Sequence, residues 1–199
     1  MTDDDHSLNG SPPSPSPSSP HGRDPGRPSA DARWTIRPET AGDIAAVHAV
    51  NAAAFPTAAE ADLVDALRED PSAWLPGLSY VAEAPDGSLA ACALLTRCRV
   101  GGVPALALAP VATVPAHQRR GAGQAVVRAL LDAARVRGES LVLVLGHPEY
   151  YPKFGFVPAS RYGIRPGFEV PDEAMMALVL DGSAAVAQGT IEYPAAFGV

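Results

Sequence analysis

A turn rich in glycine and arginine, followed at once by a long amphipathic helix, constrains this chain more than any other feature. The turn spans residues 115–124 and reads PAHQRRGAGQ. Residues 125–135 then repeat apolar side chains at helical spacing, and LVLVL at 141–145 is typical of a central strand covered on both faces. A strand, a turn, a helix and a second strand in this order predict a β-α-β unit whose two strands run parallel.

The rest of the pattern predicts two helices before this unit and antiparallel strands around it. A short strand is expected at 34–37, and helices are expected at 40–55 and 57–70, the first opened by Thr40 and Asp43 in a near capping box. Further strands are expected at 79–84, 89–99, 106–114, 156–157 and 175–180, and the strand at 89–99 is expected to be half-buried. These elements predict an α/β chain with a mixed, mostly antiparallel sheet flanked by helices.

The first 33 residues differ in composition from the rest. They hold seven Pro and seven Ser and no aromatic residue, so this segment cannot bury enough apolar surface to order itself. We expect residues 1–33 to be a disordered Pro/Ser-rich tail, either a passive extension or a docking peptide, and residues 34–199 to be a single domain. The acidic N-terminus is no secretory signal, and no apolar run is long enough for a membrane helix.

The net charge and the cysteines indicate which kinds of protein this chain is unlike. A net charge of −7 argues against a protein that binds nucleic acid or a membrane by charge alone. Two cysteines, Cys92 and Cys98, form neither a disulfide framework nor a metal-ligand spacing, so we expect a reducing, cytoplasmic location and no metal.

The glycines of the turn suggest a site for a diphosphate. Gly121 and Gly123 remove side chains where the first backbone N–H groups of a helix are unpaired, and Arg119 and Arg120 add full positive charges. The spacing fits neither a Walker A loop nor the dinucleotide fingerprint. The alternative is an ordinary glycine-rich turn beside a solvated arginine pair.

A second motif decides between these interpretations. The pattern Q-x-x-G-x-G at 118–123, followed after an apolar strand by Y-x-K-x-G-F at 151–156, resembles the GNAT family of N-acetyltransferases. The segments LGHPEYYP at 145–152, IRPE at 36–39 and PDEA at 171–174 resemble its YhbS-type branch. The resemblance covers residues 34–199.

The resemblance implies a fold and a binding mode. The central parallel pair of strands, ending near Val114 and Leu145, would splay into a V that holds acetyl-CoA. The backbone of residues 112–114 would pair with the pantetheine arm, and residues 118–124 would take the pyrophosphate. The implied cofactor-binding residues are Ala112, Thr113, Val114, Gln118, Arg119, Arg120, Gly121, Ala122, Gly123 and Gln124.

The resemblance also suggests catalytic residues. Tyr151 occupies the family position of the general acid that protonates the departing thiolate, with adjacent Tyr150 as its rival. His147 and Glu149 follow the end of a central strand, and either could be the base. For His147, a structural role in shaping the loop is the alternative.

Other polar residues are given ordinary roles. Glu60, on the second helix, is expected on a solvated face, although many relatives shape the acceptor site there. Cys92 and Cys98 point the same way along one strand and are expected to be small core or groove residues. His48 is expected to be structural.

The predicted function is therefore the transfer of the acetyl group of acetyl-CoA to a primary amine, by direct attack in a ternary complex. The acceptor is a small molecule or a protein amino group, and the sequence does not distinguish the two. A homodimer is left open. The alternative is a non-catalytic module that senses acyl-CoA.

Overall fold

The computed structural model describes residues 34–183 and 185–199, so the expected tail lies outside the described residues. The predicted helices and strands are present, with small shifts of their ends. The helices are α1 (Ile44–Ala54), α2 (Ala59–Glu69) and α3 (Ala122–Val136). The strands are β1 (Thr35–Pro38), β2 (Ser79–Glu83), β3 (Leu89–Val100), β4 (Val103–Thr113), β5 (Leu141–Leu145), β6 (Val157–Pro158), β7 (Ile164–Arg165), β8 (Met175–Val179) and β9 (Gly189–Glu192).

The strands form a mixed sheet in the order β1-β2-β3-β4-β5-β8-β6. Along this order every pair is antiparallel except β4 with β5, which is parallel as the β-α-β unit predicts. The predicted α/β class with a mostly antiparallel sheet is thus confirmed. The strands β7 and β9, which the sequence did not predict, pair with each other, and β9 also adds to the end of β3.

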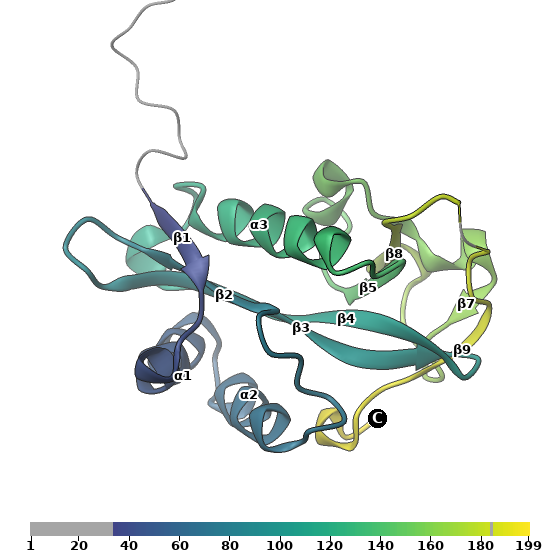
Figure 1. Cartoon of the computed structure of the whole chain (residues 1–199), viewed down its shortest axis with the longest axis horizontal. Helices are drawn as coiled ribbons and strands as arrows, with labels where there is room; N and C mark the ends of the chain where they lie inside the picture. Colours follow the sequence, from purple (N-terminus) through teal and green to yellow (C-terminus); the bar gives the residue numbers. More distant parts are fainter. Residues whose placement is uncertain (1–33, 184) are drawn as a thin grey trace, which may run out of the picture.

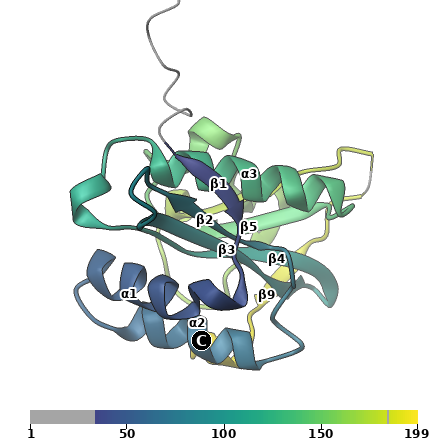
Figure 2. The ribbon, with the colours of Figure 1, turned by 60° about the vertical axis from the view of Figure 1, so that its left-hand side comes forward.

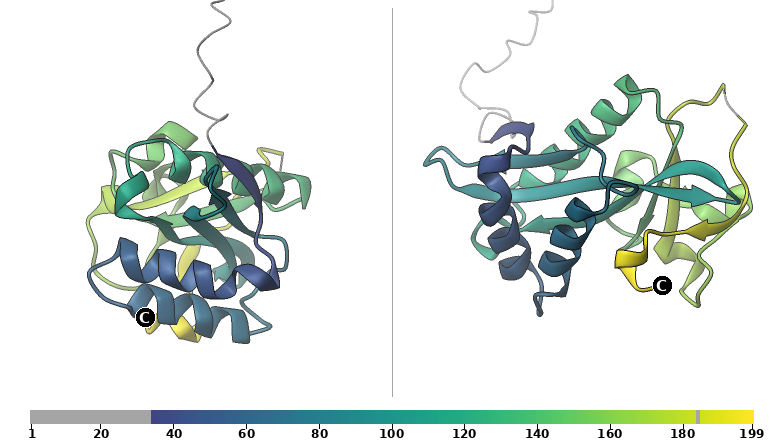
Figure 3. Two further views of the ribbon diagram at one scale, coloured as in Figure 1. Left: turned by 90° about the vertical axis from the view of Figure 1, so that its left-hand side faces the viewer. Right: turned by 60° about the horizontal axis from the view of Figure 1, so that its bottom comes forward.

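The sheet is covered on both faces. Helix α3 lies on one face, and α1 and α2 lie on the other (Figures 1 and 2). The further views in Figure 3 show the same three layers. The prediction that β3 is half-buried is therefore wrong: this strand is buried along almost its whole length. Ala93 and Leu95 pack with the α3 side, whereas Cys92 and Leu94 pack with α1 and α2.

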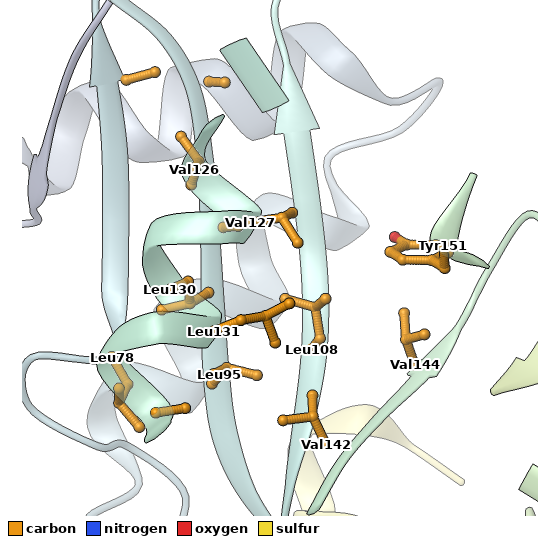
Figure 4. Packing of buried hydrophobic residues seen from close by; sticks show 14 of the residues in the cluster. Leu78, Leu95, Leu108, Val126, Val127, Leu130, Leu131, Val142, Val144 and Tyr151 are labelled. Carbon is orange, nitrogen blue, oxygen red and sulfur yellow. The ribbon is translucent and has the colours of Figure 1, made fainter. Parts of the chain in front are cut away.

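Helix α3 joins the sheet through the apolar stripe that its sequence predicts. The members of the stripe are buried: Val126, Val127, Leu130, Leu131 and Ala134. Figure 4 shows the first four against the strands of the sheet. The helix is preceded by Gly121, which has a φ of +90° and needs glycine for that reason. Gly138, with a φ of +80°, lies just beyond its end.

The strands β4 and β5 separate soon after they meet. Residues 106–107 of β4 pair with residues 142–143 of β5, and no later pair joins these strands within the described chain. Just beyond that point, residues 109–110 of β4 stand opposite the single residue Leu94 of β3, which is a β-bulge. A bulge bends the strand that carries it, and Pro110 cannot donate a backbone hydrogen bond. The gap between β4 and β5 therefore has a local cause in the sequence.

The chain after β9 returns to the α2 side of the sheet. Figure 1 shows this last segment, residues 193–199, beside α2. Because β9 is only four residues long and begins with Gly189, its sequence gave no clear strand signal. Its pairing with β3 fixes where the segment 193–199 lies.

Candidate active site

The gap between β4 and β5 leaves one backbone edge of β4 unpaired. The Val114 N–H donates to the Ala90 oxygen of the neighbouring segment at 3.0 Å, so this group is already satisfied. Backbone groups alternate in direction along an antiparallel pair. Ala112 therefore also faces β3, whereas Val111 and Thr113 direct their backbone groups into the gap. Of the three residues expected here, only Thr113 directs its backbone N–H into the gap, and Val111 is a residue that sequence reasoning missed.

The first turn of α3 lies next to this edge. The first bond of the helix runs from the Ala125 N–H to the Gly121 oxygen at 3.0 Å, so the N–H groups of residues 122–124 precede the helical ladder. Arg119 also takes a left-handed conformation, with a φ of 59°. The side chains of residues 118–120 are exposed, and the Gln118 amide donates to the Thr113 oxygen at 3.3 Å. The turn thus combines free N–H groups, two exposed arginines and the helix dipole.

Gly123 is confined by two side chains. A Cβ at this position would lie 2.8 Å from the Thr113 hydroxyl oxygen and 3.4 Å from the Tyr150 hydroxyl oxygen. Only glycine leaves both groups where they are, so the absent side chain lets the first turn of α3 lie close to β4 and to Tyr150.

Trp34 supports the turn from the first strand. Its indole N–H donates to the Arg120 oxygen at 3.2 Å, and its ring meets His117 edge-on with centroids 5.2 Å apart. Sequence reasoning used Trp34 only to mark the start of the domain. A lone, buried tryptophan at that boundary is the signal that could have suggested a longer-range role.

A cavity of about 510 Å³ continues from the gap toward α2. Residues 107–111 of β4 and 143–147 of β5 and its loop line one side of it. The other side is lined by Phe55, Glu60 and Leu63, together with residues from the C-terminal half of the chain. Tyr151 and His147 both line this cavity. The volume is typical of a pocket for a small ligand.

Tyr151 is held tightly at the cavity wall. Its side chain is buried, and its ring lies so close to Gly146 that a Cβ there would overlap the ring. Figure 4 shows Tyr151 beside Val144, with its hydroxyl pointing toward the strand that carries Leu108. Burial, with a smaller contribution from Tyr150, raises the pKa of Tyr151 to about 12. The phenol is therefore a proton donor across the whole neutral range.

Tyr150 points to a different part of the site. It does not line the cavity, and its hydroxyl approaches the first turn of α3. Its ring packs edge-on against Tyr151 at 5.1 Å, and the Lys153 ammonium lies 3.9 Å from its centroid. Burial raises the pKa of Tyr150, and the charge of Arg128 opposes that rise. The two adjacent tyrosines thus serve separate regions.

The two candidate bases are also separated. His147 is exposed at the mouth of the cavity and lines it. Glu149 is exposed in the next turn and does not line the cavity. The structure therefore brings together Tyr151 and His147 but not Glu149.

Glu60 requires a correction, because its expected position on a solvated face is wrong. Its side chain is half-buried and lines the cavity, and its Oε2 is fully buried without a hydrogen-bond partner in the described part of the chain. The cause is the orientation of α2. Ala61, Val64 and Leu67 pack on the sheet, which turns the neighbouring flank that carries Glu60 and Leu63 toward the cavity.

The cysteines and His48 have structural surroundings. Cys92 and Cys98 are buried free thiols, and burial raises the pKa of each to about 12, so neither is an activated nucleophile. The His48 Nδ1 lies 2.8 Å from a carboxylate oxygen of Asp65, which joins α1 to α2. Burial confirms that both cysteines are core residues, and the contact with Asp65 fits the structural role expected of His48.

Residues 34–183 and 185–199 contain neither a metal-binding cluster nor a membrane-spanning helix. No group of three or more His, Cys, Asp or Glu side chains converges there in a way that could hold a metal ion. In the same residues, no helix has both the length and the apolar character needed to cross a membrane.

Known proteins share this architecture. An acetyltransferase (GNAT) domain model matches residues 35–159. The uncharacterized N-acetyltransferase YjhQ of Escherichia coli K12 is 37% identical over 136 residues, which cover 66% of this chain and 74% of YjhQ. The crystal structure of the GNAT family N-acetyltransferase YhbS of Escherichia coli, in complex with CoA, is 27% identical and superposes with a TM-score of 0.78 over 90% of this chain and 97% of YhbS.

A GNAT family acetyltransferase of Brucella melitensis, solved in complex with acetyl-CoA, is 29% identical, with a TM-score of 0.68 over 82% of this chain and 97% of that one. The match to the domain model covers more than half of the chain, and it includes the β-α-β unit and the tyrosine segment described above. The chain belongs to the GNAT family of N-acetyltransferases.

Proposed function

We propose that this protein transfers the acetyl group of acetyl-CoA to a primary amine, by direct attack in a ternary complex. Membership of the GNAT family supports this activity, as do the CoA and acetyl-CoA complexes of two similar proteins. The observation that carries the proposal is the gap between β4 and β5. Its β4 edge runs from residues 107–111, which line the cavity with Tyr151, to Thr113, whose oxygen accepts from Gln118 of the glycine-rich turn.

The residues around the gap fit a long acyl-CoA. The N–H groups of Val111 and Thr113 would face the pantetheine arm, because the Val114 N–H is taken by Ala90. Residues 118–124 would hold the pyrophosphate on free helix N–H groups and two arginines. The open surroundings of Gly121, where a Cβ would meet no atom within 4 Å, are the feature of this turn that suits a diphosphate.

The chain's own groups can then assist the transfer. The thioester supplies the acetyl group, and a neutral amine must attack it. His147, at the cavity mouth, is our candidate to remove the amine proton through contact or through water. A backbone N–H at the β4 edge is our candidate donor to the oxyanion. The buried phenol of Tyr151 is our candidate acid for the departing thiolate.

A screen of amines with acetyl-CoA, in which free thiol release is followed, tests this function directly. Turnover on an amine is the expected result. Tight binding of acetyl-CoA with no turnover on any amine would instead favour an acyl-CoA sensor. The presence of Tyr151 in the cavity lining favours the enzyme over the sensor.

The assignment of the binding turn has its own experiment. Gly123→Val should abolish acetyl-CoA binding in a calorimetric titration, because even a Cβ would crowd Thr113 and Tyr150. The matched control is Gly182→Val, since a Cβ at Gly182 meets no atom within 4 Å. Thermal melting of both variants separates lost binding from lost fold. Unchanged affinity in a folded Gly123→Val protein would remove the turn from the site.

We also propose a reducing, cytoplasmic location, which the free thiols of Cys92 and Cys98 support. Association as a homodimer stays a proposal, to be tested by the mass of the protein in solution.

A further inference from the structure

The far side of the cavity is built almost entirely from apolar side chains. Phe168, Tyr193 and Phe197 form what we call the aromatic wall, with centroid separations of 6.3 Å between the first two and 5.2 Å between the last two. The Tyr193 hydroxyl donates to the Met175 sulfur at 3.7 Å. Tyr193 therefore offers its ring, rather than its hydroxyl, to a ligand in the cavity.

The helices complete this apolar surface and add one charge. Phe55 and Leu63 line the cavity beside Glu60, which carries the only acidic side chain among the described residues that line it. The nearby arginine of α2, Arg68, is already paired with Glu39 at 2.6 Å and with Asp65 at 2.9 Å. Hence no described cation neutralises Glu60.

The buried oxygen of Glu60 needs a partner. Its Oε2 has no hydrogen-bond partner in the described chain, and a buried carboxylate oxygen left unpaired is costly. A ligand ammonium in the cavity would satisfy this oxygen by a charge-assisted hydrogen bond. The apolar walls would at the same time cover a hydrocarbon or aromatic body.

We propose that the acceptor is a small primary monoamine with an apolar body, whose ammonium binds Glu60 and whose body packs on the aromatic wall. This inference rests on the proposed acetyltransferase function and narrows its substrate class. A polyamine or aminoglycoside would bring further charges against apolar side chains, without partners to satisfy them. A peptide would bring backbone polar groups to the same apolar walls. Glu60 serves here as a binding group, and proton removal stays with His147.

A comparison of amines tests the substrate class. Thiol release at saturating acetyl-CoA would be measured with phenethylamine and hexylamine against spermidine and a lysine-containing peptide. We expect kcat/KM for phenethylamine to exceed those for spermidine and the peptide by about 100-fold, the discrimination that one unsatisfied buried charge typically gives. A preference for spermidine or the peptide would overturn the substrate class while leaving the acetyltransferase function intact.

Direct binding distinguishes failure of the two proposals. Calorimetry would measure phenethylamine binding to the protein in the presence of CoA. Binding without any acetyl transfer would support the amine site and contradict the enzymatic function. Transfer to other amines without phenethylamine binding would do the opposite.

Substitution of Glu60 tests its role against a matched control on the same helix. Glu60→Gln should raise the KM for phenethylamine by about tenfold or more, with acetyl-CoA affinity unchanged. Glu69→Gln, the same change at an exposed position outside the cavity, should alter neither value. The Tm of Glu60→Gln should not fall, because the buried oxygen has no partner to lose. An unchanged KM, or a large fall in Tm, would contradict the proposal.

A variant of the aromatic wall tests where the body lies. Phe168→Ala should lower kcat/KM for phenethylamine by about tenfold, since part of an aryl group would lose its apolar cover. Ethylamine, which has almost no apolar body to pack on the wall, should change much less. Equal losses for both amines would show that the wall does not bind the body of the acceptor.

Discussion

The two faces of the sheet hold their helices by different means. On one face, α3 buries eight residues, all apolar or glycine, against the sheet. On the other face, α1 and α2 bury fewer apolar residues and have ion pairs at their edges, among them Arg68 with Glu39 at 2.6 Å. His48 Nδ1 and a carboxylate oxygen of Asp65 add a further polar contact, at 2.8 Å. The α3 side has an ion pair as well, between Arg97 of β3 and Glu139 beyond the end of the helix, at 2.6 Å.

The two faces therefore differ in role, because close packing on the α3 face stabilises the fold whereas the α1–α2 face borders the cavity. The α3 face is closely packed and specifies the β-α-β unit, whereas the cavity of about 510 Å³ opens on the α1–α2 face. A helix held partly by polar contacts at its edges can stand away from the sheet without losing a continuous apolar core. We infer that the looser packing of α1 and α2 on the sheet leaves room for a ligand in the cavity.

The largest expected effect compares one leucine from each face. Leu130 on α3 is fully buried, so Leu130→Ala should lower the free energy of unfolding by about 3 kcal/mol. Leu63 on α2 already borders a cavity, so Leu63→Ala removes fewer contacts and should cost about 1 kcal/mol. Urea denaturation of both variants measures the difference. Equal losses would show that the two faces are packed alike.

The next effect concerns the chemistry at the cavity. Tyr151→Phe keeps the ring on Gly146 but removes the proposed acid, so turnover should fall by roughly 100-fold with acetyl-CoA affinity unchanged. Tyr150→Phe should mainly weaken acetyl-CoA binding, because its hydroxyl approaches the first turn of α3. If only Tyr150→Phe lost turnover, the neighbour would be the acid. If neither did, water would protonate the thiolate.

Burial of Tyr151 changes what a pH profile can show. Since burial raises its pKa to about 12, the phenol is protonated at every pH below that value and loses its proton only above it. An alkaline decline of the rate below about pH 10 would therefore come from another group. The profiles of wild type and Tyr151→Phe should have the same shape up to that pH. A decline present only in the wild type would contradict the burial of this phenol.

The fold was predicted well where apolar periodicity specifies it. The apolar stripe of α3 allows only one buried face of the helix, and the LVLVL run indicates a strand buried on both faces. Together they predict the β-α-β unit. The burial of β3 was underestimated, since alternation along one strand does not reveal that helices cover both faces. The strand β9 was missed because its four residues gain their stability from pairing with β3, a contact remote in sequence.

The structure differs from the sequence-based site at two residues, Glu60 and Val111, and both differences have physical causes. A family motif pointed to Tyr151. Two glycines and two arginines at the start of a predicted helix pointed to the turn at 118–124. Glu60 was misassigned because α2 is amphipathic. In the sequence of such a helix, a polar residue that faces a cavity cannot be distinguished from one that faces water. Val111 was missed because which backbone groups face the gap depends on the register with β3.

A further effect tests the polar contacts on the α1–α2 side. Arg37 binds both carboxylate oxygens of Asp43, at 2.7 and 2.9 Å, and this pairing holds the pKa of Asp43 well below its usual range. Asp43→Asn should therefore cost about 2 kcal/mol at neutral pH. Because the folded pKa is depressed, this contribution is present above the unfolded value near pH 4 and is lost as pH falls through the folded one.

The measurement for this pair is the free energy of unfolding as a function of pH. The wild type should lose its advantage over Asp43→Asn as the pH falls below about 4. A constant difference between the two proteins down to pH 2 would mean that the pairing with Arg37 does not determine the protonation of Asp43.

The smallest effect concerns the pair between the two helices. The side chains of His48 and Asp65 are 41% and 43% exposed, and Asp65 keeps a second partner in Arg68 at 2.9 Å. Exposed ion pairs contribute little, so His48→Ala should cost less than about 1 kcal/mol and leave turnover unchanged. The test measures unfolding at low and high salt, with any loss smaller at high salt. A loss of several kcal/mol would mean that the packing of α1 on α2 depends on this contact.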